Sequence, residues 1–184
     1  MSIVLDPSST ALIVVDMQKD FCYEDGALYV GDQVKEIIPK IKSLIESAKA
    51  YEVPLIFTKD WHTPDDPEFG VWSPHCIQNT EGVNIIDELY TDGYFVRKRR
   101  YSAFFGTDLD LYLRERDIRT LIIVGVVTNI CVLHTAGDAA SRGYEIVIPG
   151  DCVAALSEYD QEYALYHVSS IFQGKITSSG DIVF

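Results

Sequence analysis

The segment from Leu121 to Val132 constrains the fold of this chain more than any other. It begins as a continuous run of mostly β-branched apolar residues, passes a glycine and a short polar step, and leads into a helical pattern. A run that is apolar on both faces is typical of a central strand in a covered parallel sheet. Thr128 and Asn129 are residue types that cap helices, so the segment predicts a strand, a tight turn and a helix.

Cys131 falls at the start of that predicted helix. The helix dipole and the unpaired backbone N–H groups favour negative charge there, so we expect a lowered thiol pKa. The same N–H groups can stabilise an oxyanion during acyl transfer. Cys131 is therefore a candidate nucleophile, and the alternative is that it is only a small buried apolar residue.

Composition limits the class of protein. A chain of 184 residues with 47% hydrophobic content suits one cored domain spanning residues 1–184. The net charge of −13 would repel nucleic acid and anionic membranes, so we expect neither as a partner. No apolar run approaches the roughly 18 residues that span a bilayer. The four cysteines form no CxxC pair and no basic leader opens the chain, which favours a cytoplasmic location.

Strand patterns and helix patterns alternate along the chain. Strands are predicted at residues 11–16, 53–60, 94–98, 144–149 and 175–177, and in the run from residue 121. Helices are predicted at 34–51, 82–90, 109–116 and 157–172, and after Cys131. This alternation predicts an α/β fold, a three-layer αβα sandwich with a six-stranded, mainly parallel, doubly wound sheet.

Chemically active side chains gather at the predicted strand ends. They are Asp16, Asp60, Lys98 and Cys131. Ligands of open α/β sheets bind just beyond the carboxyl ends of the strands, and a buried carboxylate is costly unless it faces a partner or a cleft. Lys98 lies in a cluster of basic residues, 97–100, and is its chemical candidate because a desolvated lysine can exchange a proton and arginine cannot.

A long proline-marked loop follows the second of these strand ends, over residues 61–76. Asp60 and His62 are two residues apart, so they face the same way on an extended segment, and His75 can fold back onto them. Two imidazoles and a carboxylate suit a catalytic zinc or another divalent ion with open positions. The alternative is that these residues only cap turns of a solvated loop.

Three motifs resemble those of the isochorismatase-like cysteine hydrolases. They are Val15–Gln18, the run from Lys98 to Phe104, and Gly125–Val132, and they occur in that family's order across nearly the whole chain. This resemblance implies that Asp16, Lys98 and Cys131 form a catalytic triad. It also implies a cis peptide between residues 126 and 127, which would aim the N–H groups of Val127 and Cys131 at the oxyanion. True isochorismatases lack the cysteine, so the namesake reaction is not expected.

The loop resembles the metal loop of the nicotinamidases within that family, through Asp60–His62 and Trp72–Cys76. The resemblance implies one divalent ion, most simply zinc, held by Asp60, His62 and His75, with Glu68 matching an additional ligand of some members. In nicotinamidases the ion binds the pyridine nitrogen of the substrate between aromatic walls. Phe21 and Trp72 are the matching positions here.

The expected activity is hydrolysis of a small amide through a cysteine thioester, with nicotinamide as the substrate and a place in NAD metabolism. A small molecule is the expected partner, and a homo-oligomer the expected state. Asn79 stands where nicotinamidases usually have glycine, which keeps open an N-carbamoylsarcosine-type or other small-amide hydrolase. Three rival hypotheses also stay open. His134 could be the base, since it shares a helix face with Cys131, the protein could be a hydrolase that uses only the metal, or it could be a non-catalytic binding protein.

Overall fold

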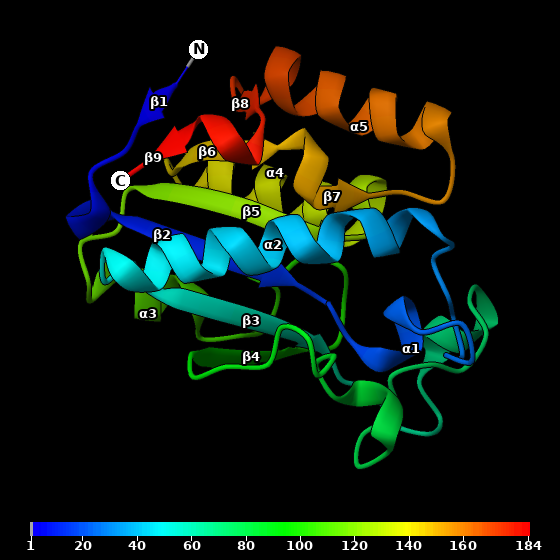
Figure 1. Cartoon of the computed structure of the whole chain (residues 1–184). Coiled ribbons are helices and arrows are strands. Elements are labelled where there is room, and N and C mark those ends of the chain that lie inside the picture. Colours follow the sequence, from blue (N-terminus) through cyan, green and yellow to red (C-terminus); the bar gives the residue numbers. More distant parts are fainter. Residues whose placement is uncertain (1) are drawn as a thin grey trace.

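A seven-stranded sheet forms the centre of the computed structural model, which describes residues 2–184 (Figure 1). Six strands run in the order β4-β3-β2-β5-β6-β8, the seventh, β7, pairs with β5, and every ladder is parallel. The strands are β2 (Thr10–Val15), β3 (Leu55–Asp60), β4 (Tyr94–Lys98), β5 (Thr120–Val126), β6 (Glu145–Pro149), β7 (Val153–Ala154) and β8 (Lys175–Thr177). The predicted parallel α/β sheet is confirmed. The strand beyond the predicted six is β7, whose two residues are too few to show a pattern.

Helices cover both faces of the sheet. Helix α2 (Gln33–Ala50) lies on one face, and α3 (Leu109–Arg114), α4 (Leu133–Ser141) and α5 (Glu158–Ile171) contribute to the core on the other (Figure 1). The apolar spacing of α2 explains its orientation, since Val34, Ile37, Ile41 and Leu44 recur at helical intervals and are all buried. The predicted three layers are therefore present.

Several short elements complete the chain. They are α1 (Lys19–Cys22), 3-10 helices at Pro7–Ser9, Pro67–Gly70, Glu81–Val83, Gly150–Cys152 and Ser179–Asp181, a π-helical turn at Thr128–Val132, and the two-stranded parallel pair β1 (Ile3–Val4) with β9 (Ile182–Val183). Within the described residues, no helix is both long and apolar enough to cross a membrane.

The predicted helix at residues 82–90 is wrong. Only Glu81–Val83 is helical, as a 3-10 turn, and the backbone then pairs with the segment after β2. The N–H of Ile86 donates to the carbonyl of Met17 at 3.0 Å. Val83, Ile86 and Leu89 are buried, as their spacing suggested, but they are buried from a 3-10 turn and the non-helical segment that follows it.

The chain order creates a switch point beside β2. The chain builds β2, β3 and β4 outward in one direction and then places β5 on the opposite side of β2. Ligands of doubly wound sheets bind at such a point, beyond the carboxyl ends of the strands. Asp16 follows β2 and Cys131 follows β5, so the two residues meet at this position.

Candidate active site

The side chains of three strand-end residues converge on the ammonium group of the fourth, Lys98. Its Nζ lies 2.7 Å from Oδ2 of Asp16, 3.0 Å from Oδ1 of Asp60 and 3.5 Å from Sγ of Cys131. Strand order explains this meeting, because β4, β3, β2 and β5 are consecutive neighbours in the sheet. All four residues are buried.

Asp16 is held by the neighbouring strand. Its backbone has a positive φ of 50°, and its N–H donates to Oγ1 of Thr58 at 3.1 Å. The Thr58 hydroxyl in turn donates to Oδ1 of Asp16 at 2.6 Å, which leaves Oδ2 facing Lys98. Burial raises the pKa of the Asp16 carboxyl, against the effect of the Lys98 ammonium. A carboxylate with a raised pKa accepts a proton more readily.

Lys98 carries the positive charge that these carboxylates need. Burial alone would lower the pKa of Lys98, but the carboxylates of Asp16 and Asp60 raise it well above its ordinary value. The side chain is therefore an ammonium ion. The rest of the basic cluster lies elsewhere, since Arg97 covers the ring of Trp61 and Arg99 and Arg100 contact Asp66.

Cys131 lies in the π-helical turn that leads into α4. Burial raises the pKa of its thiol well above the ordinary value, and Lys98 only partly opposes this. The expectation of a lowered pKa is therefore wrong, because the loss of hydration on burial outweighs the effect of the Lys98 ammonium. The thiol needs a proton acceptor, and the Asp16 carboxylate interacts with it.

The turn before Cys131 differs from its predicted details in one respect. Thr128 does not cap the helix, because its hydroxyl donates to Oε1 of Gln161 on α5 at 2.6 Å, and no side-chain cap is present. The peptide between Val126 and Val127 is cis, as the resemblance implied. Val127 and Cys131 both line the same pocket.

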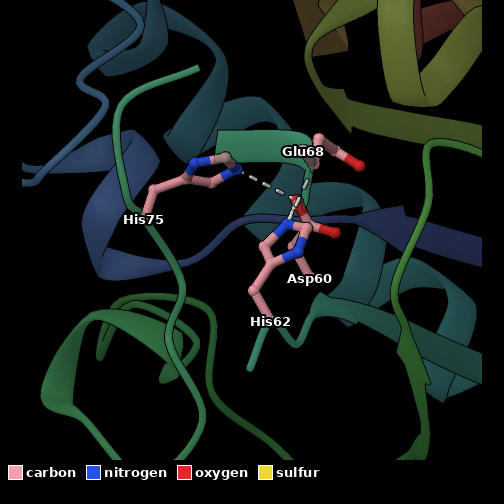
Figure 2. A group of neighbouring side chains, drawn as sticks. All are labelled: Asp60, His62, Glu68 and His75. Carbon is pink, nitrogen blue, oxygen red and sulfur yellow. Dashed lines mark ion pairs between the residues drawn. The ribbon is translucent and has the colours of Figure 1, made fainter. Parts of the chain in front are cut away.

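Four side chains of β3 and the following loop form a second cluster, shown in Figure 2: Asp60, His62, Glu68 and His75. One possible ligand atom from each lies within 4.8 Å of all the others. Nε2 of His62 and Nε2 of His75 lie 3.2 and 3.4 Å from Oδ2 of Asp60. The structure brings together the three residues that the sequence grouped and Glu68, which the family resemblance added.

The cluster suits a divalent cation. Both ring nitrogens of His62 are buried without a hydrogen-bond partner, although Nε2 faces oxygens of Asp60 and Glu68 and Nδ1 faces an oxygen of Asp66. Nδ1 of His75 lies 2.7 Å from the carbonyl of Ser73, so it carries the proton and leaves Nε2 free to coordinate. Two imidazole nitrogens and two carboxylates match the donors that zinc accepts. The residues therefore fit the ion.

Both clusters open into one pocket with about 400 Å³ of empty volume, including its mouth. Its lining residues are Phe21, Leu28, Val30, Asp60, Glu68, Trp72, His75, Tyr101, Val127, Ile130, Cys131 and Leu156. Phe21 lies 5.4 Å from the ring of His75, and the indole N–H of Trp72 donates to the Tyr101 hydroxyl at 3.1 Å. The two aromatic residues predicted for the pocket are present in its wall.

Two residues with open interpretations do not enter the pocket. His134 is exposed, and its ring lies beside the carbonyl of Ile130 and the ring of Tyr101, so it is not placed to act on Cys131. Asn79 is exposed with a φ of 65°, a conformation that glycine favours and asparagine tolerates. Asn79 therefore adopts a conformation that suits glycine, and it does not line the pocket.

Sequence reasoning missed two buried residues that support the site. Both polar atoms of the Gln18 side chain bind the backbone of Asp60, with Oε1 accepting from its N–H at 2.7 Å and Nε2 donating to its carbonyl at 2.9 Å. Asp66 lies behind His62, with 3.1 Å between Oδ2 and Nδ1. Neither residue follows a spacing rule. The only available signal for Gln18 was its place in the Val15–Gln18 motif.

Comparison with known proteins places this arrangement in a family. A model of the isochorismatase domain matches residues 10–180. The structure is similar to that of a nicotinamidase/pyrazinamidase from Bacillus subtilis, with 37% identity and a TM-score of 0.88 over 92% of this chain and 100% of that one. It is also similar to a pyrazinamidase of Pyrococcus horikoshii in complex with zinc, with 37% identity and a TM-score of 0.86 over 92% of this chain and 99% of that one. For an N-carbamoylsarcosine amidase from Thermoplasma acidophilum, the identity is 31% and the TM-score 0.85, over 93% of this chain and 96% of that one.

The chain therefore belongs to the isochorismatase family, because the family model matches almost its whole length. Its relatives identify it further as an amidohydrolase. The resemblance drawn from the three sequence motifs is confirmed.

Proposed function

We propose that the protein hydrolyses nicotinamide to nicotinate and ammonia through a thioester on Cys131. One observation carries this proposal. Three members of the cluster that suits a divalent ion line the same pocket as the two aromatic residues and Cys131; these members are Asp60, Glu68 and His75. A flat ring that carries both a nitrogen atom and an amide would use all three features together.

In the proposed reaction, Asp16 takes the proton of the Cys131 thiol. The raised pKa of the Asp16 carboxyl favours this transfer, and the raised pKa of the Cys131 thiol keeps the thiol protonated until the transfer occurs. As the proton leaves, the ammonium of Lys98, 3.5 Å from Sγ, stabilises the negative charge on the sulfur, which then attacks the amide carbon.

The N–H groups of Val127 and Cys131 are proposed to bind the oxyanion, a role worth about 3 kcal/mol for one donor. The carbon–nitrogen bond breaks, and Asp16 returns its proton so that ammonia leaves. Water then cleaves the carbon–sulfur bond, and the thiol is restored.

Asp60, His62, His75 and Glu68 are proposed to hold the ion, most simply zinc. When bound, it supplies a Lewis acid that can accept a lone pair of the substrate. Trp72 and Phe21 would orient the ring, an interaction worth about 0.5–1.5 kcal/mol beyond burial. A cytoplasmic location, a homo-oligomeric state and a role in NAD metabolism stay predictions.

The test compares kcat/KM for nicotinamide, benzamide and N-carbamoylsarcosine, followed by ammonia release on one preparation. Nicotinamide should exceed benzamide, because benzamide has no ring nitrogen to offer the ion. A carbamoyl compound presents a carboxylate that can use the same position, and the N-carbamoylsarcosine amidase among the similar structures makes it the second candidate. If that compound is preferred, or if nicotinamide and benzamide turn over equally, the nicotinamide assignment is wrong.

A further inference from the structure

Asp66 is a buried carboxylate that the proposed reaction does not use. Its side chain has no exposed surface, although both neighbours in the chain, Asp65 and Pro67, are exposed. Burying a charge is costly unless it is paired and hydrogen-bonded. Asp66 is paired with His62, Arg99 and Arg100, which compensate its buried charge and fix its position.

One side of Asp66 faces the proposed metal ligands. Oδ2 lies 3.1 Å from Nδ1 of His62, the ring nitrogen on the side away from the ligand cluster. Oδ1 accepts the backbone N–H of Glu68 at 3.1 Å and caps the 3-10 helix Pro67–Gly70. A single carboxylate therefore contacts one ligand through its ring and fixes the backbone of another.

The other side of Asp66 faces two arginines of the basic cluster. Nη2 of Arg99 donates to Oδ2 at 2.8 Å, and Nη1 of Arg100 donates to Oδ1 at 3.1 Å. Arg100 also lies 3.7 Å from Oε2 of Glu68. Both guanidinium groups remain partly exposed. They neutralise Asp66 from the solvent side and restrict its rotation.

We propose that Asp66, anchored by Arg99 and Arg100, is a positioning residue that sets the ring orientation of His62 and the place of Glu68 for metal binding. This inference rests on the proposed metal site and extends it to the residues behind the ligands. A carboxylate 3.1 Å from Nδ1 favours the proton on that nitrogen, which leaves Nε2 as the coordinating atom. The proposed role of Asp66 also gives a function to Arg99 and Arg100, which directly follow Lys98.

The test measures zinc retention by the holoprotein against increasing concentrations of a chelator. Asp66→Asn keeps the shape but loses the charge, and should lower zinc affinity about 10- to 100-fold. The control is Asp65→Asn, which removes an exposed carboxylate from the adjacent position and should leave retention unchanged. Arg99→Gln, at a half-exposed site, should produce a smaller loss in the same direction.

The outcomes separate this inference from the metal site itself. A purely structural role would lower the melting temperature of Asp66→Asn without changing zinc retention, and that result would overturn the inference. If Asp66→Asn does not yield folded protein, unchanged retention in Arg99→Gln overturns it instead. Loss of zinc in His62→Ala but not in these variants would uphold the metal site alone. A parent protein that retains no zinc would remove both.

Discussion

Replacing Lys98 with methionine tests the electrostatic arrangement at the centre of the site. Methionine keeps an unbranched side chain of similar length but removes the ammonium group. Oδ2 of Asp16 would lose its partner at 2.7 Å and keep only the Thr58 hydroxyl on its other oxygen. Asp60 would lose its partner at 3.0 Å but keep His62 and His75. Asp16 is therefore the group left with an unpaired buried charge.

Breaking a buried ion pair by removing one partner costs about 3–5 kcal/mol. We expect Lys98→Met to lower the free energy of unfolding by that amount, measured by urea denaturation with chelator present. The double variant Asp16→Asn with Lys98→Met removes the stranded charge. It should be less destabilised than the sum of the single variants, with an interaction energy of roughly 0.5–3 kcal/mol.

Lys175 provides the matched control, since it is an exposed lysine 3.9 Å from Glu145. Lys175→Met should change the stability by less than about 1 kcal/mol, because exposed ion pairs contribute little. If Lys98→Met is no more destabilising than Lys175→Met, the buried ammonium does not compensate Asp16. If the destabilisations of Asp16→Asn and Lys98→Met simply add in the double variant, the pairing of Asp16 with Lys98 is also refuted.

Two further predictions concern the strand that leads to the cysteine. Cys131→Ala should fold normally and lose activity by several orders of magnitude, because removing the nucleophile disables the whole catalytic triad. The control, Cys22→Ala, should retain activity. Near-normal ammonia release by Cys131→Ala would exclude Cys131 as the nucleophile. Gly125→Ala should lower stability by about 2–6 kcal/mol, since φ is 109° and a Cβ would overlap the Val15 carbonyl and lie 2.9 Å from its nitrogen. Gly180→Ala, with open space around it, is the control, and equal melting temperatures for the two variants would contradict the packing argument.

The strands and their ends could be predicted because each depends on local sequence. A buried parallel strand reads as an apolar run, and the residue that follows it must lie at the carboxyl edge of the sheet. Asp16, Asp60, Lys98 and Cys131 needed no further information to be placed at one edge. That they come from four adjacent strands depends on strand order, which local sequence does not determine.

The wrong predictions share a cause, since tertiary contacts overrode a local preference. Thr128 is a good helix cap, but it binds Gln161 on α5 instead. Residues 82–90 have helical spacing, but pairing with the segment after β2 extends them. The thiol pKa of Cys131 follows from its burial, which depends on every element around it. In each case the deciding partner lies far away in the sequence.

The carboxylate of Asp60 belongs to both clusters of the site. Its Oδ1 faces Lys98 at 3.0 Å, while its Oδ2 faces His62 and His75 at 3.2 and 3.4 Å. Gln18 holds its backbone from both sides, so Asp60 cannot shift toward one cluster without leaving the other. A substitution at Asp60 would disturb the lysine and the histidines together. The roles of the two clusters can therefore be separated at Lys98 on one side and at His62 or His75 on the other, each of which contacts one oxygen of this carboxylate.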